Sequence, residues 1–145
     1  MATLKKILTK KGFAEIDLTK TITNHLEVEA KVNGVKGVFI LDTGASNSCI
    51  GKDKVEKFLL EVETSDVKAA GAGSSSMETK KAVNNKIKIG DWKKKSLELV
   101  VFDLTHVNTA LEKHGAQTVD GIIGADILET GKAIIDYKKR KVYLK

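Results

Sequence analysis

Asp42 is the residue best placed to do chemistry, because it directly follows an apolar run and opens a short turn. The run is Val38-Phe39-Ile40-Leu41, and the turn continues as Thr43-Gly44-Ala45-Ser46. A strand that ends in this way places one carboxylate in a tight turn lined by backbone. Gly44 has no Cβ, so another segment can come close, and the Thr43 hydroxyl can donate or accept a hydrogen bond. Such a turn can hold two carboxylates side by side.

Three further segments accompany this turn, although an Asp-Gly-type turn alone is common after strands. Asp120-Gly121-Ile122-Ile123-Gly124-Ala125-Asp126-Ile127-Leu128 predicts an apolar strand and then a short helix. Gly71-Ala72-Gly73-Ser74 is typical of a hairpin tip, and residues 133–137 with 142–144 predict a closing hairpin. In order and spacing, the four segments resemble the retropepsin-like (retroviral-type, single-domain) aspartic proteases, and among them the bacterial members.

The resemblance covers residues 24–145 and implies an all-β fold, a single-lobe barrel with roughly one to three short helices. The protease domain would span residues 21–145 behind an N-terminal extension, residues 1–20. The implied activity is that of an aspartic endopeptidase, a hydrolase whose catalytic residue is Asp42. The remaining site residues follow from the same resemblance. Thr43, Gly44 and Ala45 would support the catalytic carboxylates, Ile122, Ile123 and Gly124 would lie behind them, and Gly71, Ala72, Gly73 and Ser74 would form a substrate-binding flap.

The chain length bears on the mechanism. The 145 residues suit one domain, and the sequence holds no second Asp-Thr-Gly or Asp-Ser-Gly. An aspartic protease needs two carboxylates, so a second copy must supply the other one. The sequence therefore predicts a homodimer with a two-fold axis between the two Asp42 side chains. Viral members tie their dimer with acidic residues and an arginine, where this chain has Ser46-Asn47 and Ala125-Asp126, so its dimer must rely on other contacts.

Ala45 carries an expectation about pH. Two carboxylates about 3 Å apart share one proton, which separates their apparent pKa values. A hydroxyl at position 45 would favour the charged form, and alanine cannot donate. We therefore expect activity to extend to mildly acidic or near-neutral pH. A pH–rate profile checks this, and an optimum below about pH 3 would contradict it.

Composition argues against several other classes of protein. Cys49 is the only cysteine, which excludes an intrachain disulfide and suits a small buried residue in a cytoplasmic protein. No apolar stretch approaches the ~20 residues of a membrane span, so no membrane partner is expected. The net charge is +6, and the basic residues are scattered along the chain except for two clusters, residues 93–95 and 138–141. Both clusters fall at expected hairpin turns, and aromatics are scarce, so no nucleic-acid partner is predicted.

Other reactive residues lack the spacing that chemistry would need. His25, His106 and His114 show no metal-ligand pattern, so neither a metal nor a cofactor is expected. Ser46 and Ser48 lack the Gly-x-Ser-x-Gly setting of a nucleophilic serine. The remaining aspartates of the second half, Asp120, Asp126 and Asp136, are interpreted as turn or cap residues.

Apolar periodicity and turn residues predict the elements. Strands are expected over residues 21–32 and 35–41, joined by a hairpin turn at Asn33-Gly34. Residues 52–60 and 105–113 predict helices, the first with Val55, Phe58 and Leu59 on one side. Residues 62–83 predict either a mobile hairpin or a long surface loop, and a Gly90-Asp91 turn leads to a strand at 97–101.

The sequence also allows a second interpretation, in which the protein does not cleave peptides. The chain would then be a dimeric peptide-binding module of the same fold, with weak or absent activity, in which Asp42 only stabilises the central turn. Sequence cannot separate the two, because a fold does not guarantee its usual activity.

Overall fold

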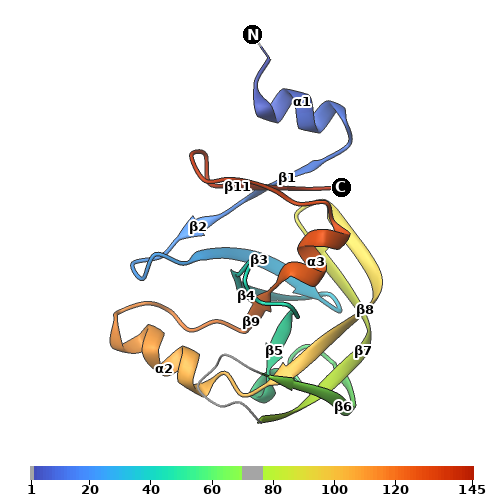
Figure 1. The fold of residues 1–145 in the computed structure, drawn as a ribbon, viewed down its shortest axis with the longest axis vertical. Coiled ribbons are helices and arrows are strands. Elements are labelled where there is room, and N and C mark those ends of the chain that lie inside the picture. Colours follow the sequence, from blue (N-terminus) through green and yellow to red (C-terminus); the bar gives the residue numbers. More distant parts are fainter. Residues whose placement is uncertain (1, 70–76) are drawn as a thin grey trace.

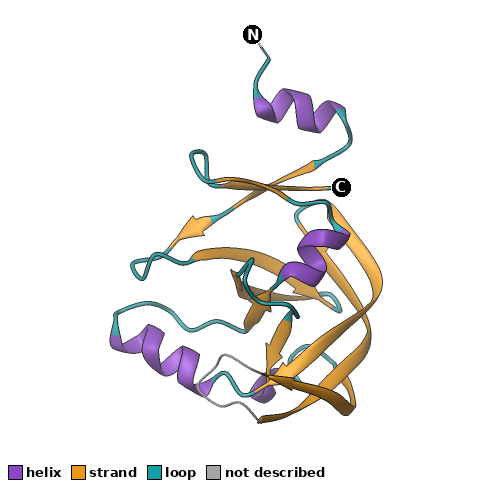
Figure 2. Ribbon diagram, in the orientation of Figure 1, coloured by secondary structure: helices purple, strands orange, loops and turns teal. Residues whose placement is uncertain are grey.

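The computed structural model describes residues 2–69 and 77–145 of this mainly β protein, as Figures 1 and 2 show. Strands and three short α-helices make up the described elements, and the all-β prediction is confirmed. In chain order they are α1 (Leu4–Lys10), β1 (Ala14–Asp17), β2 (Thr19–Lys20), β3 (Leu26–Val32), β4 (Val35–Leu41), β5 (Cys49–Gly51), the 3-10 helix η1 (Lys52–Lys54), β6 (Glu61–Ala69), β7 (Met77–Ile89), β8 (Trp92–Phe102), α2 (Thr105–Lys113), β9 (Gly121–Ile123), α3 (Ala125–Thr130), β10 (Ile134–Asp136) and β11 (Lys141–Leu144).

The β3–β4 hairpin delivers Asp42 and forms as its sequence predicts. Asn33 and Gly34 both have positive φ, 52° and 84°, which a tight two-residue turn requires. Val28, Ala30 and Val32 alternate inward along β3. β4 spans the predicted residues, whereas β3 begins at Leu26 because Thr21–His25 form a turn closed by a hydrogen bond from the Thr21 N–H to the His25 carbonyl, 2.9 Å.

The larger sheet places the Asp42 turn beside the second motif, residues 120–128. Its strand order is β2-β3-β4-β9-β5-β8-β7-β6, and a further β3–β7 pairing curls the sheet on itself. β9 runs parallel to β4 and antiparallel to β5. As a result, the residues that follow β4 and those that follow β9 meet at one edge of this barrel (Figure 1).

A smaller sheet joins the two ends of the chain, with the order β1-β11-β10. β1 pairs with β11 from Ala14↔Leu144 to Asp17↔Lys141. The first twenty residues thus contribute α1, β1 and β2, of which β2 pairs with β3. α1 lies beyond β1, at the N-terminal end in Figure 1.

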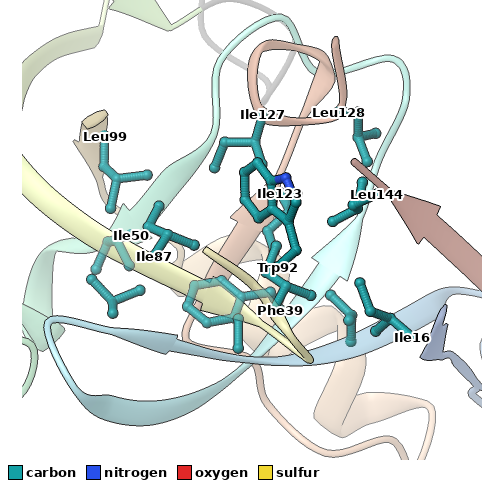
Figure 3. Packing of buried hydrophobic residues seen from close by; sticks show 14 of the residues in the cluster. Ile16, Phe39, Ile50, Ile87, Trp92, Leu99, Ile123, Ile127, Leu128 and Leu144 are labelled. Carbon is teal, nitrogen blue, oxygen red and sulfur yellow. The ribbon is translucent and has the colours of Figure 1, made fainter. Parts of the chain in front are cut away.

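One apolar core lies inside the curled sheet (Figure 3). Phe39, Ile50 and Ile123 bring β4, β5 and β9 together there, and each is at most 3% exposed. Ile127 and Leu128 anchor α3 to the same cluster. Burial of such side chains stabilises the fold by about 1.5–3 kcal/mol each, so the edge that carries Asp42 rests directly on this apolar core.

Helix α2 forms over the predicted residues and covers the outer face of β4 and β9. Leu111 is buried against Ile40 and Val119 in a second apolar cluster. The Asn108 side chain fixes the segment that follows, because it accepts from the Val119 N–H at 2.8 Å and donates to the Val119 carbonyl at 3.1 Å. Gly115 has a φ of +79° just after the helix, as expected of a helix end.

Two local predictions were wrong. Residues 52–60 form only a 3-10 helix, Lys52–Lys54, followed by turns. Phe58 is buried as expected, but Leu59 has a φ of 56° and is 68% exposed, because the positive φ ends the helical course. Residues 93–95 are not in a turn, since the chain reverses at Gly90-Asp91 and they are the exposed start of β8.

The segment predicted as a hairpin or surface loop is a hairpin in its described part. β6 and β7 pair antiparallel from Glu61↔Val83 to Ala69↔Met77, with an irregularity after Thr64. The four residues expected at the flap tip, Gly71, Ala72, Gly73 and Ser74, lie outside the described residues. Among those that are described, no helix is long and apolar enough to cross a lipid bilayer.

Candidate active site

Asp42 stands at the end of β4 with its carboxylate turned to the surface. Its N–H donates to the Ile123 carbonyl of β9 at 2.9 Å. Its Oδ1 accepts from the Gly44 N–H at 2.9 Å, and its carbonyl accepts from the Ala45 N–H at 3.2 Å. Asp42, Thr43 and Gly44 are exposed. The turn therefore orients the carboxylate without burying it, and one of its oxygens is already fixed by backbone.

The second motif packs directly on this turn, at the junction of β9 and α3. The Ala125 N–H donates to the Ala45 carbonyl at 2.7 Å. A Cβ on Gly124 would lie 2.5 Å from that same oxygen, closer than real Cβ contacts come. Gly124 has a φ of −106°, so its conformation does not require glycine. Glycine is needed there because the backbones approach so closely.

A buried serine joins the two motifs. Ser48 is 1% exposed, and its Oγ donates to Asp126 Oδ1 at 2.6 Å and accepts from the Gly124 N–H at 2.8 Å. Asp126 Oδ1 also accepts from the Ser48 N–H at 2.9 Å and the Ile127 N–H at 2.8 Å. Asp126 lies in the first turn of α3 and accepts from an N–H of that turn, but it is not the N-cap residue that was predicted, because Gly124 stands at that position. The same oxygen also fixes the segment after Asp42. Sequence reasoning had assigned no role to Ser48.

Asp120 is not a simple turn residue, which corrects its interpretation. It is 9% exposed, and its carboxylate accepts from the Val38 N–H at 2.9 Å and from Lys57 Nζ at 3.0 Å. Lys54 Nζ lies 3.9 Å from Oδ1 of Asp120, the oxygen that Lys57 also contacts. The backbone carbonyl of Asp120 accepts from the Gly51 N–H at 2.9 Å. A carboxylate buried to this extent needs such partners, and this one ties β4, β5 and β9 together behind the Asp42 turn.

Cys49 is buried beside the site and is not a nucleophile. Burial raises the pKa of its thiol to about 12, so the reactive thiolate is scarce near neutral pH. The prediction of a small buried residue is confirmed. Asp136 is the last residue of β10 and stabilises the turn that follows, because its Oδ1 accepts from the Lys139 N–H at 3.1 Å.

The three histidines do not gather into a metal site within the described part of the chain, where no group of three or more His, Cys, Asp or Glu could hold a metal ion. His25 Nδ1 lies 2.7 Å from Thr23 Oγ1 in the turn before β3. His25 and His114 instead line an open pocket of about 510 Å³ between that turn and α2. Its other lining residues include Ile22, Val107 and Leu111.

A curled sheet that presents one exposed Asp-Thr-Gly turn, backed by an Ile-Ile-Gly strand and a short helix, defines the class of retropepsin-like aspartic proteases. Comparison with known proteins agrees. The family model described as "Aspartyl protease" matches residues 28–127, and the chain belongs to this family. No curated protein sequence matches it.

Solved structures share the fold at low sequence identity. A retropepsin-like aspartic protease from Rickettsia conorii is 23% identical, with a TM-score of 0.63 over 91% of both chains. The retroviral protease-like domain of Ddi1 from Leishmania major is 20% identical, with a TM-score of 0.56 over 83% of this chain and 88% of that one. The EIAV protease, complexed with an inhibitor, is 19% identical, with a TM-score of 0.57 over 77% of this chain and 92% of that one.

Proposed function

We propose that the protein is an aspartic endopeptidase that acts as a homodimer, with one Asp42 from each subunit forming the catalytic pair. The observation that carries this proposal is the Asp42 turn itself. Its carboxylate is exposed, oriented by the Gly44 N–H, and held on a rigid edge by the contact of Ala125 with Ala45. Each chain supplies a single such turn, so two copies complete the site.

The chemistry follows from placing two identical carboxylates together. They cannot both ionise cheaply at about 3 Å, so they share one proton. The ionised group takes a proton from a water molecule held between them, and the protonated group donates to the oxygen of the scissile carbonyl. The two apparent pKa values belong to the pair and not to one subunit. Thr43 would bond across the axis and fix the two turns.

The substrate would be an extended peptide lying across the two Asp42 turns. β3 runs antiparallel to β4 with Glu27 opposite Ile40, so the Thr21–His25 turn lies beside the end of β4 that carries Asp42. The open pocket between this turn and α2 would receive an apolar side chain of the peptide. Main-chain hydrogen bonds would supply affinity in such a complex, and side-chain pockets would supply preference. The β6–β7 hairpin would cover the peptide and exclude water.

Proteolysis of a peptide library at a series of protein concentrations tests the proposal. In the dilute range, where monomers dominate, we expect the cleavage rate to rise with the square of the protein concentration, because mass action governs pairing. A rate that stays proportional to concentration down to the range where sedimentation shows only monomers would refute the paired site. Peptides that bind without being cleaved would instead favour the peptide-binding module.

A further inference from the structure

Helix α1 carries apolar side chains that the described part of the chain leaves uncovered. Of the residues of α1, all of which are described, only Leu8 is buried, and it holds the helix against the rest of the protein. Leu4 and Ile7 are 41% and 43% exposed. They are three positions apart, so they lie on one side of the helix. Figure 1 shows α1 at one end of the molecule, beyond β1, where these side chains are accessible to a partner.

The same helix is strongly basic. It contains Lys5, Lys6 and Lys10, is followed by Lys11, and has no acidic residue. Lys5 is paired within the chain, since its Nζ lies 3.5 Å from Glu15 Oε1, whereas the other three lysines extend the exposed surface. Lysines beside exposed apolar residues are typical of helices that lie in the surface of a membrane.

The fold brings a second basic segment to the end of α1. A pocket of about 310 Å³ is lined by Gly12, which follows the helix, and by Asp91, Lys93, Lys94 and Lys145 from distant parts of the sequence. The three lysines are exposed, and they outnumber the one acidic residue of that pocket. The basic cluster at the start of β8, which the candidate active site does not use, therefore continues the positive surface of α1.

An anionic lipid bilayer fits this surface better than a nucleic acid does. Proteins hold nucleic acids by charge and by stacking bases on aromatic side chains, but the exposed apolar residues of α1 are aliphatic. Leu4 and Ile7 suit the boundary between lipid headgroups and acyl chains, and the lysines suit the lipid phosphates. The chain needs no membrane-spanning stretch for such a contact, because the helix lies in the surface.

We propose that the protein docks on anionic lipid bilayers through this surface, the α1 face, made of Leu4, Lys6, Ile7, Lys10 and Lys11 with Lys93, Lys94 and Lys145. The lysines contact lipid phosphates, and the two apolar side chains enter the headgroup layer. α2 and β6 lie at the opposite end of the molecule (Figure 1), so docking through α1 leaves them free. The inference does not depend on peptide cleavage by Asp42.

Flotation of the full chain with lipid vesicles tests the α1 face. Vesicles of phosphatidylcholine alone are compared with vesicles that also contain the anionic lipid phosphatidylglycerol. We expect binding to the anionic vesicles only, and loss of that binding in 1 M salt, where the Debye length falls to about 3 Å. Equal binding to both kinds of vesicle, or binding to neither, would overturn the inference. This comparison needs no variant, so its result does not depend on whether a variant folds.

Charge reversal shows where the vesicles bind. Each basic residue near an anionic surface is worth about fivefold in affinity, so Lys6→Glu combined with Lys10→Glu should weaken binding by at least about 25-fold. Lys52→Glu combined with Lys113→Glu changes the net charge equally, at exposed positions in η1 and at the end of α2. This control should keep most of its binding. An equal loss in both variants would mean that net charge, and not the α1 face, determines binding.

The apolar contribution separates a bilayer from other polyanions. Leu4→Ser combined with Ile7→Ser should weaken vesicle binding by about tenfold, because less than half of each side chain is exposed and open to further burial. Leu59→Ser is the control, since Leu59 is 68% exposed but lies outside α1. Undiminished binding by the double serine variant would overturn the inference in favour of a general polyanion site. Binding of a random-sequence DNA duplex would then identify such a site.

Discussion

Replacing Asp42 with asparagine is expected to abolish peptide cleavage while leaving the fold intact. The amide can still accept the Gly44 hydrogen bond at Oδ1, but it cannot take a proton from water. General acid–base catalysis is worth about 10²–10⁴-fold, so the rate should fall by at least about 100-fold. Asp42 is exposed, so the free energy of unfolding should change by no more than about 0.5 kcal/mol. Library cleavage and thermal unfolding measure the two effects.

Mixing this variant with the wild-type protein gives a sharper result. If every active site needs two ionisable Asp42 side chains, a heterodimer is inactive. At equal amounts and free exchange, about a quarter of the dimers are fully wild type, so activity per wild-type chain should fall by about half. Ser46→Ala, an exposed change in the same turn, serves as the control that should not inhibit. Undiminished activity per wild-type chain in the Asp42→Asn mixture would mean that one carboxylate suffices.

Local features of the sequence predicted the hairpin that ends at Asp42 and the helix after β8. Asn33-Gly34 tolerates positive φ at both positions, and the structure uses both. α2 followed from its apolar spacing and from Gly115, and it begins and ends at the predicted residues. These features depend on residues that are close in the sequence, so propensity and turn chemistry determine them.

The connections behind the site depend on distant residues, and no local pattern contains them. Ser48 meets Asp126 across 78 positions, and Lys57 meets Asp120 across 63. A short polar residue after a turn, such as Ser48, is predicted to be solvent-exposed unless the strand that packs beside it is known. The apolar strand β9 lies between β4 and β5. That placement buries Ser48 and Asp120 and brings their partners, Asp126 and Lys57, within hydrogen-bond distance. Asp120-Gly121, at the start of the second motif, predicts a turn for the same reason: the residues that surround Asp120 are distant in the sequence.

Gly124→Ala is expected to cause the largest loss after Asp42→Asn, because it forces apart the two segments that hold the turn. The new Cβ would stand 2.5 Å from the Ala45 carbonyl oxygen and 3.2 Å from the Ala45 Cβ. The oxygen belongs to backbone that also accepts the Ala125 N–H, so it cannot swing aside as a side chain would. Overpacking of this kind costs about 1–3 kcal/mol of stability.

The catalytic loss should exceed what this loss of stability explains. Ala45 is three residues from Asp42 in the same turn, and a shift of about 1 Å in a catalytic group can cost about 100-fold in rate. Gly131→Ala is the matched control at the other end of α3. Its φ of −87° is equally ordinary, but the nearest atom to its new Cβ is Leu144 Cδ2 at 2.9 Å, which is the end of a side chain and can rotate away. Both variants should be assayed well below their unfolding temperatures. A Gly124→Ala protein as active as Gly131→Ala would show that the contact between α3 and the Asp42 turn does not position the carboxylate.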